Sequence, residues 1–275
     1  MLGKLIKYEF KATYKFMLML YGVLLIISAF MGFSYRIEPA DGILYSGHFR
    51  DESAVVDAVR ILIAILFVAI MFVVITSVFF YYINRFRKTA LGDSGYLYHT
   101  LPVKTHNHIL AKCISALFWT VASFIVAVMA YFIFIVIMYS SVAENIWHEL
   151  GEFMGMLFEE LGKNALKVTL LLISGIVSIF ALYLQIFASM AVGYSSNRHR
   201  AVKSIGVFVI FMFADSIFCS LFEPLKESLI QYRTIYAYSV STPATISIDI
   251  ALTAIFGAAL FFITRYFLKN KLNLQ

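Results

Sequence analysis

The chain has 275 residues, of which 61% are hydrophobic and 14% are charged, and its formal net charge is +6. Soluble domains are about half apolar and about a quarter charged. This composition therefore excludes an ordinary soluble protein and indicates that a bilayer surrounds much of the chain. The basic residues are dispersed rather than clustered, which argues against a nucleic-acid partner and fits membrane topology.

Six apolar runs are each long enough to cross a hydrocarbon core, which needs about 20 helical residues. The predicted fold class is an all-α polytopic membrane protein with one domain, residues 1–275. Fifteen of the 22 Lys and Arg residues fall on one side of these runs, against only Glu9 and Asp93 as acids there. That side is expected to be cytoplasmic and to hold both termini. The predicted spans are about 16–36, 60–84, 108–140, 165–195, 205–223 and 246–268.

Residues 1–15 are predicted to form an amphipathic surface helix, or elbow helix, on the inner face of the membrane. Glu9 falls in the middle of its apolar face, where an unpaired charge is costly, so a partner is expected. Two interpretations stay open: a simple salt bridge to a basic cytoplasmic loop, or a latch to a moving loop at residues 85–104. The basic stripe of this helix is Lys4, Lys7, Lys11 and Lys15.

A second amphipathic stretch, residues 147–161, carries apolar side chains on one face and glutamates mostly away from it. It is predicted to lie as a helix at the outer interface of the membrane. The alternative is that it shapes the exit of a transport pathway.

Several catalytic motifs are missing, and this argues against an enzyme. No G-x-x-x-x-G-K-[ST] occurs, so the chain lacks that device for binding ATP phosphates. His148 begins a stretch like H-E-x-x-H, but Glu152 stands where the second His is required. The pair Glu159 and Glu160 is like that of intramembrane prenyl-protein proteases, but Asn164 replaces their Arg. We expect no catalytic site, metal or cofactor in this chain, and an intramembrane hydrolase is disfavoured.

Ionisable residues inside spans are candidate functional residues. Asp215 is expected near the midplane in the fifth span, with Gln185 of the fourth span at a similar depth. Either the two form a structural hydrogen bond, or Asp215 and Gln185 line a polar substrate pathway. Asp249 starts the sixth span near the outer interface and is expected to be solvated or to cap the helix.

The loop after the second span, residues 85–103, reads R-F-R-K-T-A-L-G-D-S-G-Y-L-Y-H-T-L-P-V. Asp93 is a suitable helix N-cap and Pro102 a suitable stop, which predicts a short helix between them. That helix exposes Tyr96 and Leu97 on the cytoplasmic side, where a protein groove would accept them. The alternative is that they pack against the inner ends of the spans.

This loop resembles the one between spans two and three of ABC-2-type transporter permeases. Many of these, from low-GC Gram-positive bacteria, share R-F-[YR]-K-x-L-x-G-[DE]-x-G-Y-L-x-x-T-L-P. The opening L-I-K-Y-E-F-K, residues 5–11, resembles their N-terminal surface helix. The sequence departs from the commoner form at Ala90, and His99 supplies an imidazole that would make docking sensitive to pH.

The resemblance implies a two-fold dimer, with a second copy or a homologous permease, in the cytoplasmic membrane of a bacterium. Each subunit would dock on a separate cytoplasmic ATPase that binds ATP and Mg, through a coupling helix at residues 91–103. ATP-driven closure would then switch the dimer between inward and outward access. The implied coupling residues are Glu9, Gly92, Asp93, Ser94, Gly95, Tyr96, Leu97, Tyr98, His99, Leu101 and Pro102.

In the peptide-exporting branch of these permeases, which includes exporters of phenol-soluble modulins, the cargo is an amphipathic peptide. Spans rich in Phe, Ile and Met also suit amphipathic or hydrophobic cargo. The expected function is export of such cargo by a permease subunit. Two alternatives stay open: a resistance or immunity permease for an antimicrobial peptide or drug, and a membrane sensor or scaffold that binds an ATPase without transport.

Overall fold

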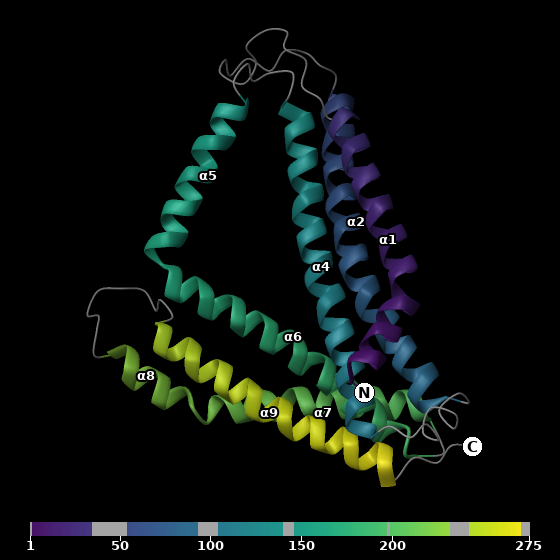
Figure 1. Cartoon of the computed structure of the whole chain (residues 1–275). Helices are drawn as coiled ribbons and strands as arrows, with labels where there is room; N and C mark the ends of the chain where they lie inside the picture. The colour runs from purple at the N-terminus through teal and green to yellow at the C-terminus, as the bar shows by residue number, and fades with distance from the viewer. Residues whose placement is uncertain are drawn as a thin grey trace. The chain divides into compact units, whose positions relative to one another are not determined.

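The computed structural model describes residues 2–34, 54–92, 104–139, 146–196, 199–231 and 242–270, and the secondary structure of these residues is helical (Figure 1). Two of the helices, α1 (Leu2–Ser34) and α2 (Ala54–Phe86), come first, and α2 continues into a π-helical turn, η1 (Arg87–Leu91). The remaining helices are α4 (Thr105–Tyr139), α5 (Ile146–Lys163), α6 (Ala165–Gly193), α7 (Arg200–Ser220), α8 (Glu223–Gln231) and α9 (Pro243–Asn270).

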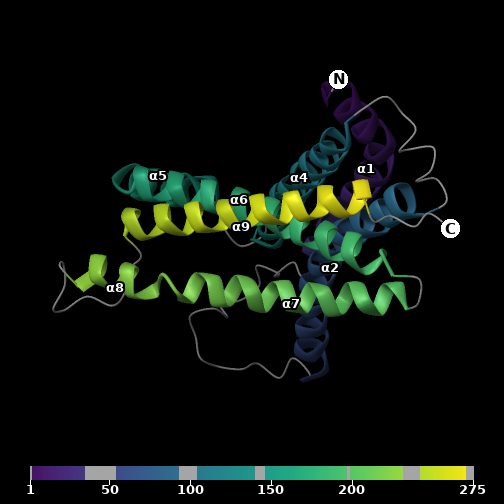
Figure 2. The same cartoon turned by 90° about the horizontal axis from the view of Figure 1, so that it is seen from below.

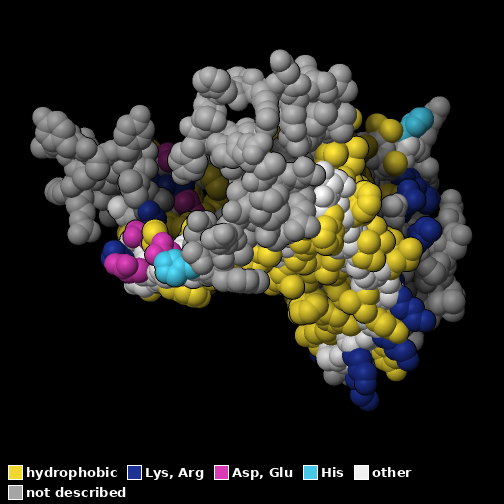
Figure 3. All heavy atoms as spheres, turned by 90° about the horizontal axis from the view of Figure 1, so that it is seen from above, with side chains coloured by type: hydrophobic (Ala, Val, Ile, Leu, Met, Phe, Trp, Pro, Cys, Tyr) yellow, Lys and Arg dark blue, Asp and Glu magenta, His cyan; other side chains and the backbone are white. Residues whose placement is uncertain are grey.

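Six of the helical segments are long and apolar enough to cross a membrane, which confirms the predicted number of spans and makes this a multi-pass membrane protein. Their outward-facing side chains are large and apolar, and Figure 3 shows hydrophobic side chains spread widely over the described helices. Such surface suits lipid rather than water. The six segments are Leu2–Ser34, Ile61–Leu91, Thr105–Met138, Ala165–Gly193, Arg200–Lys226 and Pro243–Asn270.

The first helix differs from the sequence prediction, because no break separates residues 1–15 from the span. The 33 residues of α1 form one helix, about 50 Å long at 1.5 Å per residue. In this helix Glu9, Thr13 and Met17 are buried, whereas the four lysines of the basic stripe are exposed. The placement of residues 1–15 on the inner membrane surface stays a prediction.

The chain forms two compact units. One comprises Met1–Phe10, Tyr81–Leu117 and Glu160–Gln275, and the other comprises Lys11–Phe80 and Phe118–Glu159. We call them the ion-cluster unit and the three-helix unit, after the features described below.

Within the three-helix unit, α4 packs against both α1 and α2. The rings of Phe67 and Phe134 stack with centroids 4.8 Å apart, which joins α2 to α4. The hydroxyl of Tyr21 on α1 lies 2.9 Å from the Trp119 carbonyl oxygen and 2.7 Å from Ser123 Oγ on α4. Hydrogen bonds between helices satisfy polar side chains that lipid could not.

Within the ion-cluster unit, α6 packs against both α7 and α9 (Figures 1 and 2). Small residues permit these close approaches. A Cβ on Gly193 would lie 2.5 Å from the backbone nitrogen of Ser204. The helices α6 and α7 can therefore pack this closely only because residue 193 is a glycine. A Cβ on Gly257 of α9 would lie 3.5 Å from that of Ala181 on α6, which is ordinary contact.

Candidate functional site: a buried ion cluster on three helices

Glu9 stands at the centre of a buried ion cluster to which α1, α2 and α4 each contribute one side chain. Its two carboxylate oxygens accept hydrogen bonds from two different cationic side chains. Arg85 Nε donates to Oε2 at 2.7 Å, and Lys112 Nζ donates to Oε1 at 2.9 Å. One carboxylate therefore ties the start of α1 to the end of α2 and to the first turns of α4. The salt-bridge partner expected for Glu9 is confirmed, and its role as a latch stays a prediction.

Burial makes this cluster energetically important. The side chain of Lys112 is 2% exposed, that of Glu9 11% and that of Arg85 20%. Removing one partner of a buried ion pair costs about 3–5 kcal/mol, because the remaining charge is left unpaired. With two cations and one anion, the cluster carries a formal charge of +1. Both cations are therefore paired with the same carboxylate, that of Glu9.

The helical turn that carries Arg85 is held by aromatic packing. Phe86 stacks on Phe187 of α6 with ring centroids 4.1 Å apart and planes 6° from parallel. One turn earlier, the Tyr82 hydroxyl lies 2.7 Å from Ser115 Oγ of α4, and its ring meets the edge of Tyr183. These buried contacts fix the end of α2, so Arg85 reaches Glu9 from a rigid position.

Directly after Arg85 and Phe86 the chain enters the π-helical turn η1, whose Ala90 and Leu91 are buried. π-helical turns inside helices are frequent at functional sites. Gly92 follows in extended conformation, and a Cβ there would lie 2.9 Å from the carbonyl oxygen of Lys88. This close approach requires glycine at the last described position before the predicted coupling helix.

Most of the predicted coupling residues lie outside the described residues. Of that set, the structure places Glu9 in the ion cluster and Gly92 at the end of η1. The predicted helix between Asp93 and Pro102 is not among the described parts. The members outside the described ranges are Asp93, Ser94, Gly95, Tyr96, Leu97, Tyr98, His99, Leu101 and Pro102.

Asp215 and Gln185 are not joined. Gln185 is buried on α6, and Asp215 is half-buried on α7 with the Cys219 thiol 4.0 Å from its Oδ1. Among the residues that the structure describes, no hydrogen bond connects the two side chains. The structural hydrogen bond expected from their equal depth is therefore wrong, because equal depth does not fix which way two neighbouring helices are turned.

Asp249 meets one of its two expectations, because its side chain is 48% exposed, but it fails the other. It lies inside α9, which begins at Pro243, so it does not cap that helix. Instead its Oδ1 lies 2.6 Å from Lys226 Nζ on α8, and Glu223 Oε1 lies 3.0 Å from the same nitrogen. Lys226 is buried between these two half-exposed acids. The three residues fasten α8 to α9.

Sequence reasoning missed Lys112 as a specific partner of Glu9. A signal was present, because Lys112 falls inside the apolar run that begins at Ile109, where a lysine needs a counter-charge. Within the described ranges, no group of three or more His, Cys, Asp or Glu side chains is placed to hold a metal ion. The chemistry that this cluster offers is mechanical connection of three helices by charge.

No model of a known protein family matches the chain, and comparisons with curated proteins and with solved structures give no match either.

Proposed function

We propose that this chain is the permease subunit of an ATP-driven exporter of the ABC-2 type, which moves amphipathic peptides or other hydrophobic cargo out of the cell. Its energy comes from a separate cytoplasmic ATPase that binds ATP and Mg. The observation that carries the proposal is the position of the Glu9 cluster: it lies at the base of the loop whose sequence resembles the coupling loop of such permeases.

The cluster supports a mechanical role for that loop. Gly92 is separated from Arg85 only by Phe86 and the turn η1, whose inner side chains are buried. A rigid connection of this kind transmits a displacement of the loop to the end of α2. Glu9 passes the displacement on to α1, and through Lys112 to α4. Movement of the ATPase would thus shift three spans together, which is what alternating access needs.

The cargo class follows from the surfaces of the spans. Their exposed side chains include many Phe, Met, Ile and Leu residues. Such surfaces favour hydrophobic and amphipathic molecules, and flexible Met side chains suit cargo of varied shape. A second copy of the chain, or a homologous permease, completes the transport path in this proposal.

The test is copurification of the ATPase. In the double variant Tyr96→Ala with Leu97→Ala, we expect the affinity for the ATPase to fall more than about tenfold, because two anchoring side chains contribute at least about 1 kcal/mol each. The matched control truncates Tyr131 and Phe132, an adjacent exposed pair on α4, and should leave copurification unchanged. Normal copurification with the loop variant would contradict docking through this helix.

A second readout separates transport from the alternatives. An exporter should hydrolyse ATP faster when an amphipathic peptide is added to the reconstituted complex, and should move that peptide across the vesicle membrane. A sensor or scaffold would bind the ATPase without moving peptide. A resistance permease would respond to antimicrobial peptides or drugs rather than to peptides made by the same cell.

A further inference from the structure

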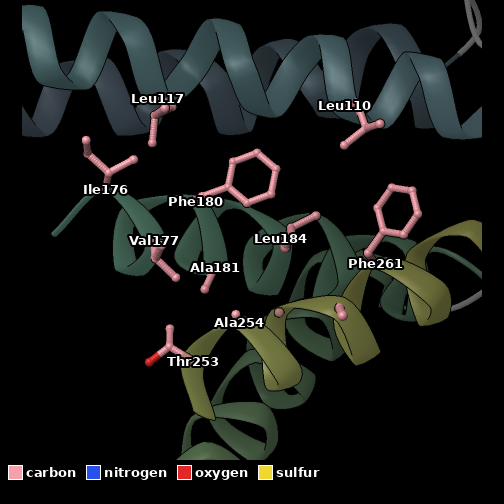
Figure 4. Close-up of a pocket in the computed structure, with 12 residues that line it drawn as sticks. Leu110, Leu117, Ile176, Val177, Phe180, Ala181, Leu184, Thr253, Ala254 and Phe261 are labelled. Atoms are coloured by element: carbon pink, nitrogen blue, oxygen red, sulfur yellow. The ribbon is translucent and has the colours of Figure 1, made fainter. Parts of the chain in front are cut away.

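A cavity of about 450 Å³ lies among α4, α6 and α9 within the ion-cluster unit (Figure 4). Leucines from α4 face phenylalanines from α6 and α9 across it. Thr253 is the one lining residue with a polar side chain. Residues that shape the cavity include Leu110, Leu117, Phe180, Ala181, Ala258 and Phe261.

The cavity exists because its floor is made of small residues. Ala254, Gly257 and Ala258 lie on one side of α9, and Ala181 of α6 touches Gly257. Large side chains here would close the space. The space is partly open, since the lining residues Ala254 and Ala258 are exposed, and its apolar lining lacks packing contacts from within the chain on that side. Its volume is in the range of small-molecule sites, so an apolar ligand that fills it would restore those contacts.

One end of the cavity has a cation positioned beside it. Ala254, Ala258, Phe261 and Arg265 follow one another at helical spacing, so they share a face of α9. Arg265 is exposed and lies about 6 Å beyond Phe261 along the helix axis. At the same end, His106 of α4 stands one turn before Leu110.

The opposite end has a different charge. Asp249 stands one turn before Thr253 on α9, and its carboxylate is already paired with Lys226. A molecule with an apolar chain and a negative head would therefore enter with its head at the Arg265 end. On the topology predicted from the basic residues, that end faces the cytoplasm, where anionic lipids attract basic side chains.

We propose that the cavity holds one acyl chain of an anionic phospholipid, whose phosphate contacts Arg265. The chain fills the space between α4, α6 and α9, and the arginine selects the headgroup charge. The bound lipid acts as a structural part of this unit. The inference needs only the membrane location and the predicted orientation of these helices, so it stands or falls independently of the proposed transport function.

The test compares two neighbouring residues of α9. Both Ala258 and Ala259 are exposed, but only Ala258 lines the cavity. The full chain and its Ala258→Phe and Ala259→Phe variants are reconstituted in vesicles of equal parts phosphatidylglycerol and phosphatidylcholine. They are then extracted in mild detergent, and retained phospholipid is measured by native mass spectrometry.

We expect the wild type and Ala259→Phe to retain one phosphatidylglycerol molecule per chain. In Ala258→Phe the amount of retained phosphatidylglycerol should fall by at least about fivefold. Arg265→Gln should keep lipid binding but lose the preference for phosphatidylglycerol over phosphatidylcholine. If Ala258→Phe fails to fold, Ala254→Leu fills the same cavity with a smaller side chain. Equal retention by the two Phe variants would overturn the proposal. So would complete displacement of the lipid by an amphipathic peptide, since the cavity would then belong to the cargo.

Discussion

Lys112 Nζ lies 2.9 Å from Glu9 Oε1, although 103 residues separate the two along the chain. The lysine is almost fully buried and shares this carboxylate with Arg85. The start of α1 is therefore fixed to α4 and to the end of α2 by a single acidic side chain. The first two predictions follow from the fact that Arg85 and Lys112 share the Glu9 carboxylate.

Glu9→Gln should be strongly destabilising. It removes the anion that both Arg85 and Lys112 contact and leaves two cations close together in a buried site. We expect a loss of about 3–5 kcal/mol in the free energy of unfolding, measured by titration of mixed detergent micelles with a denaturing detergent. Glu152→Gln is the control, because that side chain is 61% exposed and its partner is an exposed histidine. Equal stability of the two variants would show that the cluster contributes little.

Lys112→Met should cost less than Glu9→Gln. The methionine fills the volume of the lysine stem, and Glu9 keeps its contact with Arg85 at 2.7 Å, so a neutral pair remains. The expected loss is about 1–2 kcal/mol, measured in the same titration. In the double variant with Glu9→Gln, the penalty of the unpaired lysine disappears, so the combined loss should be smaller than the sum. Strict additivity would contradict the direct pairing of Lys112 with Glu9.

Gly193→Ala should disturb the packing of α6 on α7. The added Cβ would lie 2.5 Å from the backbone nitrogen of Ser204, and a backbone atom cannot move aside as a flexible side chain can. We expect a loss of about 1–3 kcal/mol from overpacking. Gly175→Ala on the same helix is the matched control, because nothing lies within 4 Å of its added Cβ. A wild-type unfolding midpoint for Gly193→Ala would disprove the close approach of the two helices.

The effect of Asp215→Asn tests whether this residue lines a pathway. Asp215 is half-buried, and among the described residues no ion pair holds its carboxylate, so stability and expression should change little. If the carboxylate faces the cargo, the transport rate should change by about tenfold, which corresponds to about 1.4 kcal/mol. Ser216→Ala, at the next and exposed position, should leave transport unchanged. Unchanged transport by Asp215→Asn in the presence of normal expression would remove Asp215 from the pathway.

Local sequence was sufficient to predict the spans but not the partners of their charged residues. The six apolar helices follow from the length and hydropathy of each run, which neighbouring helices do not alter. Glu9 could be assigned a basic partner because its place on the apolar face of α1 required one. Which cation it meets depends on how α1 packs against α2 and α4, and no single helix specifies that.

The same limit explains why the pairing expected for Gln185 and the helix cap expected for Asp249 are not found. Gln185 and Asp215 were predicted at matching depths in successive spans, yet no hydrogen bond joins them among the described residues, and Asp215 Oδ1 lies 4.0 Å from the thiol of Cys219 one turn later on α7. Asp249 begins an apolar run in the sequence, but α9 starts six residues earlier, and Lys226 from the preceding helical segment reaches it. Depth follows from counting along a helix, whereas contact requires the rotation of each helix about its own axis.

The most direct test of the proposed function is peptide movement in proteoliposomes that contain the chain and its ATPase partner. With ATP and Mg supplied on the side of the ATPase, we predict that a labelled amphipathic peptide accumulates across the membrane. Accumulation should stop when the P-loop lysine of the ATPase is replaced. Peptide movement that is independent of ATP hydrolysis, or a stable complex that hydrolyses ATP without moving peptide, would contradict an ATP-driven permease.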